Sequence, residues 1–83
     1  MPVARVSGQS DADGLLAALG AAIRAARTAR GLSQEALADA AKIDRSHMGK
    51  IERGERNVTL LNLARVAGAL DCAPSQLLAD AGW

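Results

Sequence analysis

Two short segments in the middle of the chain constrain its fold more than any other feature. Residues 33–40 and 44–53 each carry a few regularly spaced apolar side chains, and only three or four residues separate them. Ser33 and Asp44 can cap the segments by accepting a backbone N–H, and Gly54 follows the second segment as a stop signal. Helices of about eight residues cannot bury a face alone. The pattern therefore predicts two helices that pack against each other across a tight turn and against a further helix.

Three more helices are predicted around this pair. In residues 14–30, apolar side chains recur at three- and four-residue steps, which indicates an amphipathic helix that Gly31 ends. Thr59 can cap a fourth helix, and Pro74 suits the first turn of a fifth. The apolar stripe of the fourth helix is predicted to comprise Leu60, Leu63, Ala64, Ala67 and Leu70.

The composition favours the same all-α fold. The 83 residues allow one small domain, and 19 Ala and 11 Leu supply most of the 49% hydrophobic content. These side chains lose little rotamer freedom in a helix, so we expect no sheet. Residues 1–12 have no periodicity and are predicted to be a flexible N-terminal tail, with residues 13–83 as the domain.

Several classes of protein are disfavoured by what the sequence contains. A single Cys72 cannot close an internal disulfide. Because His47 is the only histidine that could join Cys72 as a metal ligand, we expect no metal and no cofactor. No apolar run approaches the roughly 20 residues of a membrane span, and no signal-peptide core is evident, so we expect a cytoplasmic protein. One His, one Cys and no phosphate-cradling glycine loop argue against an enzyme.

Charge distribution points to a polyanionic partner although the net charge does not. The net charge is only +1, but the stretch from Arg24 to Arg56 contains eight cations and five anions. The rest of the chain is net negative. Positive charge is thus concentrated around the predicted pair of short helices, where it can meet a nucleic acid.

The motifs "GLSQEALA" and "IERGERN", followed by a leucine-spaced helix, resemble the Cro and phage-repressor type of helix-turn-helix domain, the XRE family. The resemblance covers residues 15–78. It implies a five-helix, lambda-repressor-like bundle that binds double-stranded DNA as a homodimer and regulates transcription, for example as a repressor. Because no sensor domain follows, the chain is most similar to stand-alone members such as restriction-modification controllers, small phage repressors and antitoxins.

The resemblance also implies site residues. With residues 44–53 as the recognition helix in the major groove, the base-contacting positions are Arg45, Ser46 and Lys50, and Gly49 either allows close approach to DNA or is simply tolerated. Arg45 can donate two bonds to guanine, whereas Ser46 can donate or accept. The residues expected at phosphates are Ser33, Gln34, His47, Arg53, Arg56 and Asn57. The alternatives are that His47 is a bystander and that the arginines belong to a solvated turn.

Two structural features follow from the family pattern. Arg27 and Glu52 occupy positions that pair in relatives, although they can also be independent surface charges. Lys42 stands at a turn position where relatives often carry Gly, and a left-handed backbone there costs a non-Gly residue about 1–2 kcal/mol.

A dimer is expected because one recognition helix reads too few base pairs to find a single site in a genome. The expected interface comprises Val66, Leu70, Leu77, Leu78 and Trp83, together with Cys72. Alternatively, Leu77 and Leu78 complete the core of the monomer. A rival function is a protein-interaction module, such as an antitoxin, whose main partner is a toxin or an RNA polymerase subunit.

Overall fold

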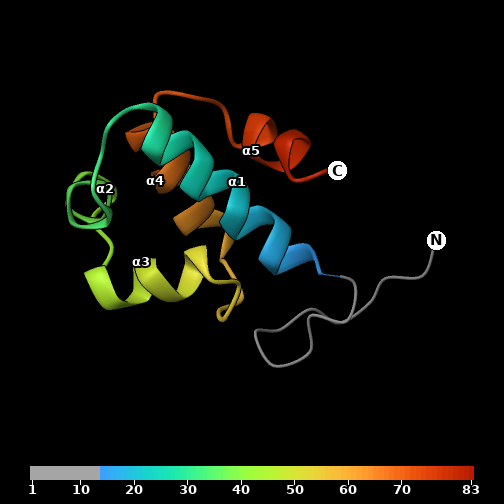
Figure 1. The fold of residues 1–83 in the computed structure, drawn as a ribbon, viewed down its shortest axis with the longest axis horizontal. Helices are drawn as coiled ribbons and strands as arrows, with labels where there is room; N and C mark the ends of the chain where they lie inside the picture. Colours follow the sequence, from blue (N-terminus) through green and yellow to red (C-terminus); the bar gives the residue numbers. More distant parts are fainter. Residues whose placement is uncertain (1–13) are drawn as a thin grey trace.

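A computed structural model of the protein describes residues 14–83, and all regular elements in that range are helices (Figure 1). They are α1 (Leu15–Ala29), α2 (Gln34–Ala41), α3 (Arg45–Glu52), α4 (Leu60–Ala69) and α5 (Pro74–Asp80). The predicted all-α, five-helix fold is confirmed. The predicted tail, residues 1–12, lies outside the described residues.

Three predicted caps set the starts of α2, α3 and α4. Ser33 Oγ accepts from the Ala36 N–H at 3.0 Å, and Thr59 Oγ1 accepts from the Asn62 N–H at 3.1 Å. Asp44 accepts from the backbone N–H of Ser46 at 3.0 Å. Each bond satisfies a donor that has no partner inside its own helix, so the helix boundaries follow from local chemistry.

The core lies where the five helices meet. In the ribbon α1 crosses the molecule diagonally, and it packs against α3 and α5, while α2 packs against α3 and α4 (Figure 1). The largest fully buried side chains are Ile23, Leu37, Met48, Ile51, Val66 and Leu77. Two of these, Met48 and Ile51, belong to α3, so this helix is fixed by one face and leaves the other exposed.

A glycine sets the distance between α1 and the end of α3. A Cβ added to Gly20 would lie 2.5 Å from the carbonyl oxygen of Ile51 and 2.6 Å from that of Glu52. Both neighbours are backbone atoms that cannot swing aside. Only glycine therefore lets α1 cross the end of α3 this closely, a constraint that the sequence analysis did not identify.

Three of the residues expected at a dimer interface belong to the monomer core instead. Val66, Leu70 and Leu77 are 0%, 2% and 0% exposed, because they lie on the faces of α4 and α5 that pack inward. The prediction that they contact a second subunit is therefore wrong. Leu78 is partly buried against the same core, while Trp83 is 59% exposed.

The predicted apolar stripe of α4 is also wrong at its first residue. Leu60 is 78% exposed and its neighbour Leu61 is 60% exposed, whereas Leu63 and Ala67 are buried as expected. Ala64 is exposed, and Val66 takes its place in the core. Within the described chain, no helix has the length and apolar character needed to cross a membrane.

Candidate nucleic-acid interface

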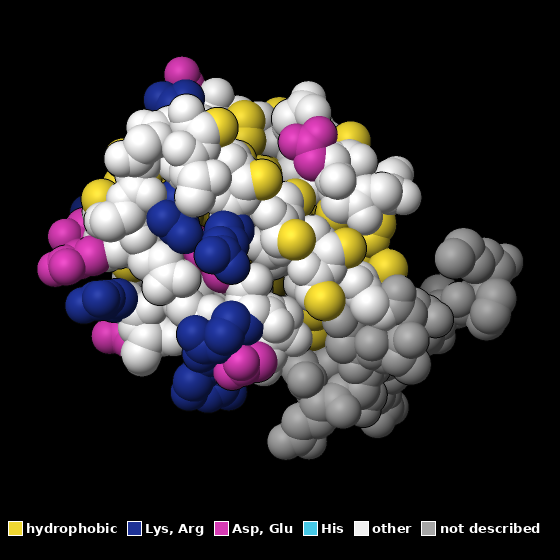
Figure 2. All heavy atoms as spheres, in the orientation of Figure 1, with side chains coloured by type: hydrophobic (Ala, Val, Ile, Leu, Met, Phe, Trp, Pro, Cys, Tyr) yellow, Lys and Arg dark blue, Asp and Glu magenta, His cyan; other side chains and the backbone are white. Residues whose placement is uncertain are grey.

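The outer face of α3 is the most prominent polar surface of the molecule. Arg45, Ser46 and Arg53 are exposed, and Lys50 is half-buried, while the opposite face of the helix is in the core. In Figure 2, most Lys and Arg side chains gather toward the left and lower left, where α3 lies in Figure 1. Many hydrophobic side chains reach the surface toward the right of the same view.

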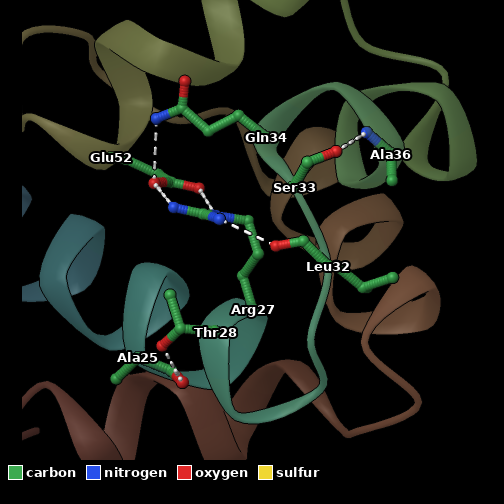
Figure 3. Close-up of polar contacts among 8 residues, drawn as sticks. All are labelled: Ala25, Arg27, Thr28, Leu32, Ser33, Gln34, Ala36 and Glu52. Atoms are coloured by element: carbon green, nitrogen blue, oxygen red, sulfur yellow. Dashed lines mark hydrogen bonds and ion pairs between the residues drawn. The ribbon is translucent and has the colours of Figure 1, made fainter.

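The inner end of α3 is held by a buried carboxylate. Glu52 accepts from Arg27 Nε at 2.7 Å and from Arg27 Nη2 at 3.1 Å, so the expected pair is present (Figure 3). A further Arg27 nitrogen, Nη1, donates to the carbonyl oxygen of Leu32 at 2.8 Å. The Glu52 side chain is 2% exposed and that of Arg27 is 12% exposed. The pair thus joins α1 to α3 and to the loop before α2.

Gln34 adds a third bond to this carboxylate, which fixes how its amide points. Gln34 Nε2 donates to Glu52 Oε1 at 3.0 Å (Figure 3). An ionised carboxylate can only accept, so the NH₂ group must face Glu52 and the amide oxygen must face away from it. One of the two N–H donors that Gln34 was expected to offer a phosphate is therefore already engaged. Backbone N–H groups in the first turn of α2 have no partner within the helix and remain suited to an anion.

Gly49, which was expected either to allow close approach to DNA or to be simply tolerated, is not at the surface. It is buried, and a Cβ there would lie 3.1 Å from Arg53 Nη1 and 3.6 Å from Gln34 Oε1. The absence of a side chain makes room for these two groups.

The Ser46 hydroxyl has a defined role in the hydrogen-bond network. Its Oγ donates to Asp44 Oδ2 at 2.5 Å, and this bond, followed by the backbone N–H groups of His47 and Ser46, lowers the pKa of Asp44 from its ordinary 3.8. Because the hydroxyl proton is engaged in the hydrogen bond to Asp44, the Ser46 oxygen is left with lone pairs that can accept another hydrogen bond. Ser46 is therefore suited to accept from an exocyclic amino group of adenine or cytosine.

Two arginines of the surface have carboxylate partners. Arg53 Nε donates to Glu55 Oε2 at 2.7 Å, and this bond raises the pKa of Arg53 and lowers that of Glu55 from its ordinary 4.5. Arg45 lies 3.9 Å from Glu35, and both side chains are about 70% exposed. A phosphate or base that takes either guanidinium must displace or share a carboxylate.

An open groove of about 450 Å³ lies between α3 and the start of α4. Its polar lining includes three cations, Lys42, Lys50 and Arg56, together with His47, Ser46 and Asn62. His47 and Arg56, which were expected at phosphates, are thereby brought together, while Asn57 is exposed in the loop between α3 and α4. Lys42 and Asn62 were not identified as site residues. The one sequence feature that could have drawn attention to either residue was Lys42 at a turn position where relatives often carry Gly.

Comparisons with known proteins agree with this geometry. The family described as "Helix-turn-helix" matches residues 23–77. The control protein C.SmaI of Serratia marcescens is 42% identical over 60 residues, which are 72% of this chain and 71% of that protein. Across four such relatives the match spans between 58% and 71% of the relative's length.

Solved structures give the same result. The restriction-modification controller protein C.AhdI from Aeromonas hydrophila has a TM-score of 0.75 and 50% identity, covering 80% of this chain and 97% of that one. The clp gene regulator ClgR from Corynebacterium glutamicum has a TM-score of 0.80 and 34% identity, covering 82% of this chain and 72% of that one.

Proposed function

The chain belongs to the helix-turn-helix family of DNA-binding transcription regulators, and from that premise we propose that it acts in the cytoplasm as a homodimer on a near-palindromic operator. The observation that carries the proposal is the two-sided character of α3. Its inner face is fixed by the core and by Glu52, and its outer face presents charged and polar tips. A rigid helix with this arrangement fits the major groove of B-form DNA.

Base recognition is assigned to the outer face of α3. Arg45, near the start of the helix, donates two bonds to the O6 and N7 of guanine, and Lys50 reaches a base edge one turn later. Ser46 accepts from adenine or cytosine, because its own proton is held by Asp44. One good bidentate contact contributes roughly 1–3 kcal/mol of discrimination.

Phosphate contacts are assigned to the flanks of the helix. At the start of α2, the Ser33 hydroxyl and the backbone N–H of Gln34 bind one strand, supported by the helix dipole. Arg53, Arg56 and Asn57 bind the backbone beyond the other end of α3, and His47 contributes when protonated. These contacts fix orientation and carry no sequence information of their own.

Two copies are required for selectivity. A single helix discriminates only a few base pairs, whereas a genome offers roughly 10⁶–10⁹ competing sites. A twofold dimer would place its two α3 helices about 34 Å apart. With Val66, Leu70 and Leu77 in the core, the large apolar side chains most exposed for the contact are Leu60, Leu61 and Trp83. We place the interface among these three.

The test is a binding selection from random duplexes, repeated with four variants. Wild-type protein should recover two inverted half-sites about 10 base pairs apart, centre to centre. Arg45→Ala should relax the preference at one position of each half-site, and Arg53→Ala should weaken binding to all sequences alike. Two further variants test the interface, the double variant Leu60→Ser with Leu61→Ser and the single variant Trp83→Ser. Each should lower the sedimentation coefficient to that of a monomer and shorten the recovered motif to one half-site.

The selection, together with a salt titration of DNA affinity, separates this function from that of a protein-interaction module. Such a module would have a toxin or an RNA polymerase subunit as its main partner. DNA recognition predicts that log affinity falls with log salt by about 0.9 per phosphate neutralised. Weak, salt-tolerant binding with no recovered motif would contradict the proposal. An unchanged motif for Arg45→Ala would contradict only the docking of α3.

A further inference from the structure

Lys42 adopts a backbone conformation that a lysine rarely takes. It caps the C-terminus of α2 with φ 58° and ψ 43°, in the left-handed region. Among the described residues only Lys42 and Asp71 combine a side chain with a positive φ. A short Asp or Asn tolerates this region through local hydrogen bonds, and Gly has no Cβ to clash. Lysine has neither advantage, so its position in the turn calls for a reason outside the turn itself.

The surroundings of the side chain supply that reason. Lys42 lines the groove between α3 and the start of α4 together with Lys50, Arg56 and the Asn62 amide. In the part of the chain that the structure describes, no carboxylate lies within ion-pair distance of Lys42, Lys50 or Arg56. The acidic group that also lines the groove, Asp44, is engaged by Ser46 and by the start of α3. Three cations thus line an open groove whose one carboxylate, Asp44, is already hydrogen-bonded to Ser46, and the nearby charges of Lys50 and Arg56 help to lower the pKa of Glu55.

The position of the groove suits it to a second DNA strand. It shares Ser46 and Lys50 with the outer face of α3, and Gln34 at the start of α2 is not among its lining residues. A helix in the major groove has a sugar-phosphate backbone on each side. If the start of α2 meets one strand, the groove is positioned for the other.

We propose that Lys42 is a phosphate-binding residue, which with Arg56 and Asn62 holds one phosphate of the second DNA strand in this groove. The strain of the turn remains in the free protein, and the contact of the ammonium contributes only when DNA is bound. The inference rests on the proposed function, since its ligand is the DNA backbone. It assigns a DNA contact to Lys42 and Asn62, two residues with no role in the family resemblance.

Lys42→Gly provides a test in which stability and binding should change in opposite directions. Glycine relieves the strain, so the melting temperature should rise. Loss of one phosphate contact in each subunit of the dimer should weaken binding to specific and random duplexes alike, by roughly 60-fold at about 0.1 M salt, and reduce the slope of log affinity against log salt by about 1.8. Lys42→Arg keeps the charge and should keep the slope.

Two control variants separate strain from charge. Asp71→Gly removes the other strained residue with a side chain, at the end of α4, and should raise stability without weakening DNA binding. Arg24→Gln removes an exposed cation of α1, and its effect on the slope should be much smaller than that of Lys42→Gly.

Duplexes with a neutral methylphosphonate at one backbone position at a time locate the contact. One position should weaken wild-type binding and have a smaller effect on Lys42→Gly, which keeps only Arg56 and Asn62 at that phosphate. Lys42→Gly with full affinity and slope, against a wild type that binds DNA with a steep salt dependence, would overturn the inference and leave the proposed function intact. A wild type that shows no salt-dependent binding would overturn both.

Discussion

Two ion pairs at opposite sides of α3 have the same 2.7 Å separation and very different surroundings. On the inner side, Arg27 and Glu52 have side chains 12% and 2% exposed, and on the outer side Arg53 and Glu55 are 56% and 52% exposed. Distance alone would make them equivalent. Their burial indicates that the inner pair holds α3 in place, whereas the outer pair can exchange its partner.

The two pairs differ because solvent can replace a lost partner only where the remaining charged group is exposed. If Arg27 leaves, the Glu52 carboxylate stays buried with only Gln34 to compensate it, and water cannot reach it. If Glu55 leaves, water or a phosphate can take its place at Arg53. Substitutions on the inner side should therefore change stability, and those on the outer side should change DNA binding.

Arg27→Ala should have the largest effect. Removal of one partner leaves an uncompensated buried charge, so the free energy of unfolding should fall by about 3–5 kcal/mol. Chemical denaturation followed by circular dichroism measures this. Arg24→Ala, an exposed cation on the same helix, is the matched control and should stay within about 0.5 kcal/mol of wild type. Equal losses for the two variants would show that the inner pair is no stronger than a surface pair.

Gly20→Ala should have the next largest effect, because it forces α1 away from the end of α3. The added Cβ meets two backbone oxygens, and overpacking of this kind costs about 1–3 kcal/mol. Gly68→Ala is the control, since a Cβ on that α4 glycine meets nothing within 4 Å. It should stabilise the protein by about 0.4–1 kcal/mol. A stable Gly20→Ala protein would mean that the two helices are not held at this separation.

Local hydrogen bonds and long-range ion pairs differ in how far the sequence predicts them. The caps Ser33, Asp44 and Thr59 were predicted correctly, because a cap depends on residues within one turn. The Arg27 and Glu52 pair joins residues 25 positions apart, and only the family resemblance implied it. No local pattern distinguishes a pair of this kind from two surface charges.

Periodicity has a similar limit at the apolar positions. It identifies residues that share a helix face, but it does not reveal what covers that face. Leu60 was therefore placed in the stripe of α4 and Leu77 at a subunit interface, whereas the first is exposed and the second fully buried. The groove at Lys42 depends on how the turn between α2 and α3, the helix α3 and the start of α4 come together, which has no local signal in the sequence.

Glu55→Gln should produce a smaller effect than Arg27→Ala and Gly20→Ala, and one of the opposite kind, a gain of DNA affinity. Arg53 would no longer have to leave a carboxylate to meet a phosphate, so binding to every duplex should tighten by roughly two- to fivefold, the range expected for an exposed ion pair. Contact with Arg53 lowers the pKa of Glu55 from its ordinary 4.5, so the carboxylate stays charged near neutral pH. The gain should therefore be constant across the neutral range, as fluorescence anisotropy titrations can measure.

A double-mutant cycle separates this release of Arg53 from a general loss of negative charge near DNA. If Glu55 acts through Arg53, the gain should disappear when Glu55→Gln is made in an Arg53→Gln background. A gain of the same size in both backgrounds would mean that Glu55 only repels phosphates, and that the outer pair has no influence on binding. Glu35→Gln, which affects the longer 3.9 Å contact with Arg45, should give a smaller gain, because the weaker contact holds its guanidinium less firmly.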